Sequence, residues 1–570
     1  MHAPSDHQGS ASGGESPALS ASQATERITF YHWLVVIIAS CGWLFDCMDQ
    51  RLFTLARESA LKDLLANDPT KLGNVKEFIG LATMAMMVGW ATGGIIFGIM
   101  SDKWGRVKTM VVTLLVYSGF TGLCGIAHGW LDFVFYRFLV GLGVGGMFGA
   151  ATTLVAESVP GRFRTVALGS LQALSAVGNM LGATLSLGIN PGQENFLGSF
   201  AGWRVLFFVG ILPAILVVPI MFILKEPEPW KRAKAEAASR SGRGQKVGSM
   251  ADLFRQPRWR RNTLVGICLG LAGMVGLWGI GFFSPELIST ALKEQPLRAK
   301  DLLQPQAIVA SLQSPTNAAL AEVKRRLSPD VARQIDSAGT ALPAALSEPL
   351  LKELNALILH GSLYSETTFQ QFPLKKGTQN LIQQLAKKPS ASDQMFLNRQ
   401  LLEQVFPGAI SEMQKTMDNV RGKGMFLQDV GALLGMFAFT YLAAAFSRRL
   451  AFLLSFAMCL VTTAYVFYAL KSATDAYWML PLMGFAQLAV FAGYSIYFPE
   501  IYPTRLRGTG VGFCYNTVRY LAAPFPYMLG WLSTQMPFRT AAILMSSIYI
   551  LGAVALIWAP ETKGKPLPED

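Results

Sequence analysis

The chain has 570 residues, of which 51% are hydrophobic and only 15% are charged. A soluble protein normally has about a quarter charged residues, so the composition excludes an ordinary soluble globular protein and favours a membrane protein. The formal net charge of +13 does not indicate nucleic-acid binding, because the basic residues lie in short loops between apolar segments. The sequence contains no Cys-x-x-Cys pair and no histidine cluster, so we expect no metal, no cofactor and no disulfide framework.

Residues 1–29 are rich in Ser, Ala, Gly and Gln, which predicts a disordered tail. Apolar segments long enough to cross a bilayer follow, in two sets of six. We expect them at 31–50, 78–100, 108–127, 131–156, 164–189, 202–224, 262–289, 425–446, 450–470, 476–500, 508–533 and 539–559. The sequence therefore predicts an all-α membrane protein with twelve transmembrane helices.

The distribution of Lys and Arg predicts the orientation of these helices. The central loop 225–261 contains eleven Lys or Arg and four acidic residues, and alternate short loops are basic. The positive-inside rule then places both termini and the central loop in the cytoplasm. A polar stretch at 291–422 follows the seventh segment, so we expect it to be a helical extracytoplasmic insert.

We divide the chain accordingly into a cytoplasmic tail (1–29), an N-terminal six-helix half (30–225), a cytoplasmic central loop (226–261), a seventh transmembrane helix (262–290), the insert (291–422), the remainder of the C-terminal half (423–560) and a cytoplasmic tail (561–570). The protein is expected to be a multi-pass monomer in the lipid bilayer of a bacterial inner (plasma) membrane.

The pattern Glu-x-x-Pro-x-Arg-x-Arg occurs twice, at 157–164 and again at 500–507. Each copy joins two apolar segments, so one helix–loop–helix unit is duplicated within the chain. Internal duplication across a bilayer is typical of secondary transporters, whose substrate site lies between the repeats.

The loop after the second apolar segment reads Gly98-Ile-Met-Ser-Asp102-Lys103-Trp-Gly105-Arg106. With this loop and the duplicated pattern, the chain resembles the major facilitator superfamily, whose signature there is Gly-x-x-x-Asp-(Arg/Lys)-x-Gly-(Arg/Lys). The resemblance implies a fold of two parallel six-helix repeats.

These loop residues are also expected to form a gate at the inner face, because charge-assisted hydrogen bonds between helix ends can hold one face closed. We expect Asp102 to lie near a helix end, with Arg162 and Arg164 close by on the same face. The alternative is that the basic residues only anchor the loops at the inner membrane surface. The predicted gate residues are Gly98, Asp102, Gly105, Arg106, Glu157, Arg162, Arg164, Glu500, Arg505 and Arg507.

The first apolar segment contains Asp46 and Asp49, which are three residues apart and share a helical face. Carboxylates in a membrane helix are costly and mark functional sites. The fourth segment contributes Arg137 near its outer end. This arrangement resembles proton-coupled members of the family, and the doubled acid resembles the aromatic-acid/proton symporter group. The resemblance implies that Asp49, Asp46 and Arg137 couple transport to protons; the alternative is that the acids face water beyond the helix end.

Two sets of residues are candidates for substrate binding. Gln172 and Asn179 share a face of the fifth segment, and the resemblance to sugar porters implies that such amides, with Trp278 nearby, bind hydroxyl groups. The eleventh segment reads Tyr515-Asn516-Thr-Val-Arg519, which resembles organic-acid porters. Arg519 lies deep enough in its segment to need an anionic partner, such as a substrate carboxylate.

An internal ion pair of Arg519 with Asp429 or Glu286 is the alternative to a substrate carboxylate. The preferred hypothesis is a proton-coupled permease for a small organic anion, whose partners are its substrate, protons and lipid. A sugar or polyol symporter is the second hypothesis, and a transporter-like sensor that reads through the insert is the third. No nucleophile–base pair or phosphate loop is present at membrane depth, so we expect no enzymatic activity.

Overall fold

The computed structural model describes residues 28–65, 75–189, 191, 193, 196–198, 200–239, 247–296, 305–338, 344–361, 363–365, 374, 376–387, 391–406 and 411–569. The predicted disordered tail lies outside this part of the chain, apart from its last two residues. Regular structure in the described residues is helical, with one isolated bridge between Leu197 and Phe200. The all-helical fold predicted from the sequence is confirmed.

The helices of the N-terminal half are α1 (Phe30–Leu64), α3 (Val75–Trp104), α4 (Arg106–Gly125), α5 (Trp130–Ser158), α6 (Gly161–Gly188), α7 (Gly202–Val209) and α8 (Val217–Ile223). The last two are joined by a 3-10 turn and together form the sixth predicted segment. Helix α1 continues fourteen residues beyond the predicted end at residue 50. It does so because Phe53, Ala56 and Leu61 are buried in a core cluster with Phe133 and Trp203.

The central loop contains two short helices, α9 (Glu228–Ser239) and α10 (Met250–Arg255). The helices of the C-terminal half are α11 (Pro257–Met274), α12 (Ser284–Lys293), α20 (Ser411–Ala445), α21 (Arg448–Ala469), α22 (Ala473–Glu500), α23 (Arg507–Ala522), α24 (Pro524–Gln535), α25 (Phe538–Met545) and α26 (Ile548–Ala555). Between α11 and α12 the chain passes through a π-helical turn and a 3-10 turn.

Eleven helical segments of the described chain are long and apolar enough to cross a membrane. The predicted eleventh segment, 508–533, is divided between α23 and α24 and does not form one helix. The break falls at Ala523, before Pro524, and proline lacks the N–H that would continue the helical hydrogen bonds. The remaining predicted segments each correspond to one of the eleven.

The insert is helical, as expected, and consists of α13 (Pro305–Gln313), α14 (Ala318–Arg326), α15 (Pro329–Ser337), α16 (Ala344–His360), α18 (Lys376–Lys387) and α19 (Ala391–Val405). Its apolar residues, such as Leu401, share one core cluster with Phe467 and Leu470 of the C-terminal half. Helix α20 begins at Ser411, so the last residues assigned to the insert extend the eighth helix outward. The division into domains stays a prediction.

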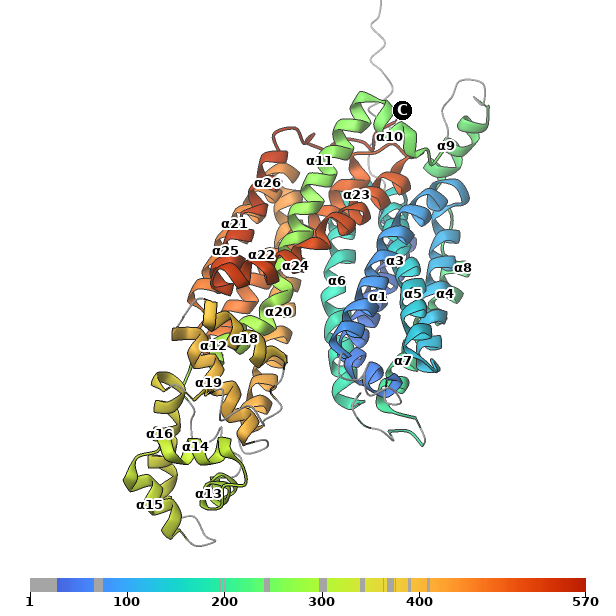
Figure 1. Ribbon diagram of the computed structural model, residues 1–570. Helices are drawn as coiled ribbons and strands as arrows, with labels where there is room; N and C mark the ends of the chain where they lie inside the picture. Colours follow the sequence, from blue (N-terminus) through green and yellow to red (C-terminus); the bar gives the residue numbers. More distant parts are fainter. Residues whose placement is uncertain are drawn as a thin grey trace, which may run out of the picture.

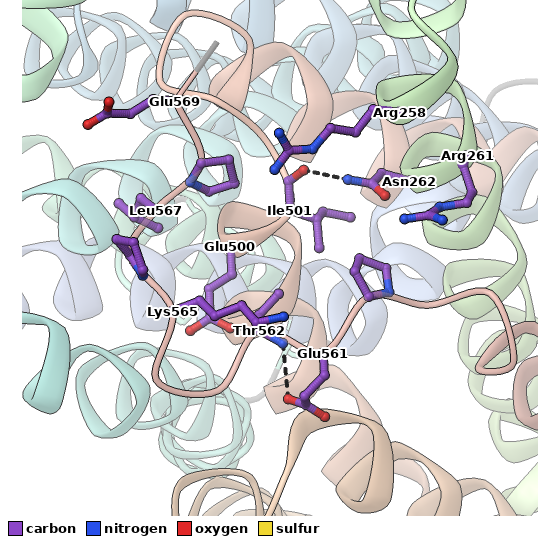
Figure 2. A pocket seen from close by; sticks show the side chains of 13 residues that line it. Arg258, Arg261, Asn262, Glu500, Ile501, Glu561, Thr562, Lys565, Leu567 and Glu569 are labelled. Carbon is purple, nitrogen blue, oxygen red and sulfur yellow. Dashed lines mark hydrogen bonds between the residues drawn. The ribbon is translucent and has the colours of Figure 1, made fainter.

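The two halves stand side by side in Figure 1, and the insert lies beyond the C-terminal half. Helices α9 and α10 and the C-terminus lie at the opposite end of the molecule, which we call the α10 end. There the C-terminal segment 560–569 passes over the start of α11 and the end of α22 (Figure 2). The halves meet where α3 packs on α23 and α6 packs on α20. These contacts pair the second helix of each half with the fifth helix of the other.

Glycines allow α3 and α5 to approach closely within the N-terminal half. A Cβ atom at Gly145 would lie 2.1 Å from the carbonyl oxygen of Trp90, and one at Gly93 would lie 2.0 Å from that of Leu142. Close approach of helix backbones through small residues is a main source of helix association in membranes. The glycine run in α5 is therefore used for packing.

We expect Gly145→Val to destabilise the protein, because the new side chain meets a backbone carbonyl that cannot move away. Overpacking of this kind costs about 1–3 kcal/mol. Gly119→Val is the matched control, since nothing lies within 4 Å of a Cβ atom at Gly119. Thermal unfolding of both variants in detergent measures the difference, and equal melting temperatures would contradict the packing argument.

Candidate functional site

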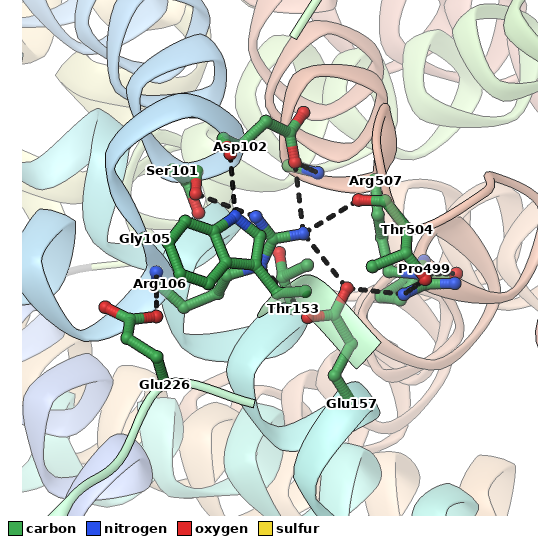
Figure 3. A network of polar contacts seen from close by, with 12 residues as sticks. Ser101, Asp102, Gly105, Arg106, Thr153, Glu157, Glu226, Pro499, Thr504 and Arg507 are labelled. Atoms are coloured by element: carbon green, nitrogen blue, oxygen red, sulfur yellow. Dashed lines mark hydrogen bonds and ion pairs between the residues drawn. The ribbon is translucent and has the colours of Figure 1, made fainter. Parts of the chain in front are cut away.

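A buried ion network at the α10 end is centred on Glu157. Arg106 donates to it from Nε and from Nη2, both at 3.0 Å. Arg507 of the other half donates to the same carboxylate from Nη1, and Figure 3 shows Glu157 between the two arginines. All three side chains are fully buried. A buried charge is stable only when it is paired and hydrogen-bonded, so these contacts tie the two halves together. We call Glu157, Arg106, Arg507 and Asp102 the first network.

Asp102 completes the first network by binding the N-terminus of α23. Its carboxylate accepts hydrogen bonds from the backbone N–H groups of Gly508 (2.9 Å) and Thr509 (2.7 Å) and from the Thr509 hydroxyl (2.6 Å). It also lies 3.2 Å from Nη2 of Arg106. An anion at a helix N-terminus is stabilised by the free N–H groups and the helix dipole. Asp102 is therefore a second bond between the halves.

The C-terminal half repeats this arrangement in a second network, formed by Arg448 and Glu500. Arg448 donates to Glu500 from Nε at 3.1 Å and from Nη2 at 2.8 Å. Its Nη2 also donates to the Thr165 hydroxyl of the N-terminal half at 2.5 Å. The duplicated sequence thus produces two related ion networks, each with a contact across the interface between halves.

In each half, a glutamate side chain caps the N-terminus of the third helix, which is α4 in the first half and α21 in the second. Glu226 accepts hydrogen bonds from the backbone N–H groups of Arg106 and Val107, and Glu561 accepts them from Arg448 and Arg449. Burial alone would raise the pKa of Glu561, but its backbone N–H donors lower it below the ordinary value. The carboxylate is thereby held in its charged form at the start of α21.

Three further predicted gate residues, Gly98, Gly105 and Arg505, lie outside the two networks. Gly105 has a φ of +126°, and a Cβ atom there would lie 2.2 Å from Glu226. Gly98 lies at the crossing of α3 and α23, where a Cβ atom would be 2.7 Å from the carbonyl oxygen of Gly508. Arg505 pairs with Asp252 of α10 at 2.6 Å and so holds the central loop.

The expectation that Arg162 and Arg164 lie close to Asp102 on the same face stays a prediction. Arg164 donates from Nε to the carbonyl oxygen of Ala156 at 2.9 Å, and Arg162 is exposed on α6. The partners of Asp102 are Arg106 and the N-terminus of α23. Sequence spacing could not show the contact of Asp102 with α23, because it joins residues 406 positions apart.

A central cavity of about 190 Å³ lies between the halves. The predicted substrate residues that line it are Gln172, Asn179, Trp278, Tyr515 and Arg519. Asn516 is not among the lining residues. It is fully buried at the crossing of α3 and α23, and its Nδ2 donates to the carbonyl oxygen of Gly512 at 2.9 Å.

Arg519 is the main polar feature of this cavity. Its guanidinium carbon lies 3.5 Å from the ring centroid of Trp90 and 5.2 Å from that of Tyr515. The residue is only 3% exposed, and yet its Nε and Nη1 have no hydrogen-bond acceptor among the described residues. A buried guanidinium held by aromatic rings, with free donors, can bind a ligand carboxylate through two parallel hydrogen bonds.

The two acidic residues considered as internal partners of Arg519, Asp429 and Glu286, have other surroundings. Asp429 pairs with Arg51 of α1, with 2.6 Å between Oδ2 and Nη2, and Glu286 is exposed. The pair of Asp429 and Arg51 joins the halves and lines the cavity. Sequence reasoning missed this pair, although Arg51 directly follows the first predicted segment and Asp429 lies within the eighth.

Asp49 and Asp46 are fully buried, which overturns the alternative that they face water beyond the helix end. Arg137 lies 3.6 Å from Asp49, between Nη1 and Oδ2, and packs on the rings of Phe53 and Phe207. Both oxygens of Asp46 lack a hydrogen-bond partner in the described chain. The three groups lie within the N-terminal half and do not line the cavity.

Comparison with known proteins gives a family match over part of the chain. A sequence model described as Major Facilitator Superfamily matches residues 41–320. A putative metabolite transport protein of Haemophilus influenzae is 31% identical over 47% of this chain and 62% of its own length. The cis,cis-muconate transport protein of Acinetobacter baylyi is 30% identical over 37% of this chain and 49% of its own length.

The chain thus spans about half the length of the curated relatives it matches. The structure resembles the proton:xylose symporter XylE bound to 6-bromo-6-deoxy-D-glucose, with a TM-score of 0.56 and 16% identity, over 94% of this chain and 98% of that one. At this identity the likeness shows the fold alone, and it confirms the predicted arrangement of two six-helix repeats. Both curated relatives are named as transport proteins.

We expect Glu157→Gln to destabilise the protein, because two buried arginines would lose their shared anion. Removing one partner of a buried ion pair costs about 3–5 kcal/mol. Glu228→Gln is the control, since Glu228 pairs with Lys231 on the surface. Thermal unfolding in detergent compares the variants with the parent chain. A Glu157→Gln protein as stable as the control would show that the first network does not hold the halves together.

Proposed function

We propose that the chain belongs to the major facilitator superfamily, whose sequence model matches residues 41–320, and that it is a secondary active transporter. We propose further that it is coupled to protons and carries a small organic anion with a carboxylate group. In this proposal both termini face the cytoplasm, the protein is a monomer in a bacterial inner membrane, and the α10 end is its inner face.

The environment of Arg519 is the observation on which the substrate proposal rests. Its guanidinium lines the central cavity, is fixed over Trp90, and has two nitrogen atoms without acceptors. A buried cation without a counter-ion is costly, so a substrate anion would satisfy a group that the protein leaves unpaired. The transport of cis,cis-muconate by a relative accords with an anionic substrate.

Alternating access follows from the bonds at the two ends of the cavity. The two ion networks close the α10 end, and the pair of Arg51 and Asp429 joins the halves beside the cavity. Opening the inner face requires the bonds of Asp102 and Arg507 across the interface to break. Opening the outer face requires Arg51 and Asp429 to separate. All of these bonds are formed in the structure, which supports a proposed state that is closed at the α10 end and joined beside the cavity.

Proton coupling is assigned to Asp49, Asp46 and Arg137. The 3.6 Å between Asp49 and Arg137 is longer than a hydrogen bond, so the pair is loose and a proton can compete with the arginine for the carboxylate. Helix α1 connects this pair with the substrate, because Cys47, Gln50 and Arg51 of the same helix line the cavity. Protonation of the pair would thus act on the cavity through one helix.

A neutral sugar or polyol is the second candidate substrate. Gln172 and Asn179 line the same cavity, and Oε1 of Gln172 has no hydrogen-bond partner among the described residues. These amides suit hydroxyl groups, and they would equally suit hydroxyl groups on an organic acid. A transporter-like sensor remains a third candidate; the complete first network favours transport instead.

We expect Arg519→Lys to weaken substrate binding about tenfold or more, because a lysine supplies charge without two parallel hydrogen bonds. Binding is measured in detergent with a panel of carboxylates that includes cis,cis-muconate, and with D-xylose as the neutral probe. Arg449→Lys, at an exposed position, is the control. Equal binding of a neutral sugar to the parent chain and to Arg519→Gln, without competition by any carboxylate, would refute the anion proposal.

We expect Asp49→Asn to abolish uphill accumulation in proteoliposomes and to preserve substrate exchange, because the amide mimics a permanently protonated acid. Exchange needs no net release of protons. Asp63→Asn is the control, since Asp63 lies at the end of α1 and pairs with Arg204 on the surface. Accumulation driven by a pH gradient that is unchanged in Asp49→Asn would move the coupling site elsewhere, with Asp46 as the next candidate.

A further inference from the structure

A second cavity, of about 540 Å³, lies at the α10 end and shares no residue with the central cavity. The first turns of α11, the end of α22 and the C-terminal segment 560–569 form its walls (Figure 2). Its volume is within the range of small-molecule sites, about 300–1,000 Å³. Of the predicted gate residues only Glu500 lies in its wall, and none of the predicted substrate residues does.

Three basic side chains line this cavity: Arg258 and Arg261 of α11, and Lys565 of the C-terminal segment. None of them has an acidic partner in the described part of the chain. The glutamates in the wall already serve other groups, because Glu500 binds Arg448 and Glu561 accepts backbone N–H groups of α21. The carboxylate of Glu569 points away from both arginines in Figure 2. The three basic side chains are therefore available to an anion, although the wall as a whole holds as many acidic as basic side chains.

Asn262 adds a buried polar group to the same wall. It is 3% exposed, and its Nδ2 donates to the carbonyl oxygen of Ile501 at 2.8 Å. Its Oδ1 has no hydrogen-bond partner among the described residues. A buried acceptor without a partner needs an explanation, and a donor group on a bound molecule is one such explanation.

We propose that this cavity is a binding site for a phosphate-bearing small molecule, whose phosphate is held by Arg258, Arg261 and Lys565. Planar guanidinium groups match the geometry of phosphate oxygens, and lysine adds a point charge. A free phosphate ester and the headgroup of an anionic lipid share this chemistry. The location of the site in the cytoplasm rests on the proposed function, whereas the site itself does not.

An occupied site would strengthen the closed state of the inner gate. The segment that carries Lys565 is already attached beside the gate, because the Thr562 hydroxyl donates to Glu500 at 2.6 Å and Tyr497 donates to the carbonyl oxygen of Pro560 at 2.9 Å. Glu500 in turn holds Arg448, which donates to Thr165 of the other half. A phosphate between Lys565 and the arginines would fix this segment over the second network.

Isothermal titration of the full chain with inorganic pyrophosphate, in neutral detergent at low salt, tests the site. We expect saturable binding to the parent chain, and binding weakened about tenfold or more in R258Q/R261Q, since each lost charged hydrogen bond is worth about a factor of ten. The matched control is R255Q/R260Q, which removes the same charge from two exposed arginines that do not line the cavity. Absence of binding to the parent chain, or an equal loss in the control, would overturn the proposal.

Titration in nanodiscs separates the two sources of phosphate. If phosphatidylglycerol nanodiscs abolish pyrophosphate binding and phosphatidylcholine nanodiscs do not, a lipid headgroup occupies the site. If both bind pyrophosphate equally, the ligand is a free phosphate compound. Either result supports the site. The measurement involves no transport, so the site stands if the proposed transport fails, and transport stands if the site fails.

Discussion

Glu157 accepts hydrogen bonds from two arginines that come from different halves of the chain, and the closed arrangement of the α10 end depends on this carboxylate. The three side chains have no contact with water, so neither arginine can leave Glu157 unless something else replaces the bond. Water can do so only at a helix end, where the interface can open to solvent. The bonds of the first network lie at such an end, whereas the pair of Arg51 and Asp429 joins the halves beside the cavity.

The proposed proton site obeys the opposite constraint. Asp49 and Arg137 belong to one half, so the pair need not separate when the halves move relative to each other. A charge exposed to lipid during that movement would be very costly. Placing the proposed proton site inside one half, and the cavity between the halves, separates protonation from the moving interface. Helix α1 connects the two, because successive positions on it face either the acid pair or the cavity.

The two networks are related by duplication but are not equivalent. The first has Asp102, which holds the N-terminus of α23 with three hydrogen bonds, whereas the matching loop of the second half has no acid and relies on Thr165. The crossing of α3 with α23 therefore has more charge-assisted hydrogen bonds between the halves than the crossing of α6 with α20. The second network compensates through the C-terminal segment, whose Thr562 binds Glu500.

The amino-acid sequence by itself determined the class of this protein. Apolar length predicted the membrane helices, and the repeated Glu-x-x-Pro-x-Arg-x-Arg pattern predicted the duplication, because helix formation and burial in lipid depend on local composition. The division of the eleventh segment at Pro524 was also visible locally and was missed. The extension of α1 was not visible, since it depends on packing against Trp203 and Phe133.

Partners across the two halves were decided only by the tertiary structure. Arg519 was recognised as a buried cation, but its position over Trp90 could not be predicted, and the pairing of Asp429 with Arg51 was missed. Asn516 follows Tyr515 directly, and yet it packs between helices while Tyr515 lines the cavity. The physical reason is common to these cases. Sequence sets which residues are charged, apolar or small along each helix, whereas the rotation and contact of helices hundreds of residues apart decide which charge meets which.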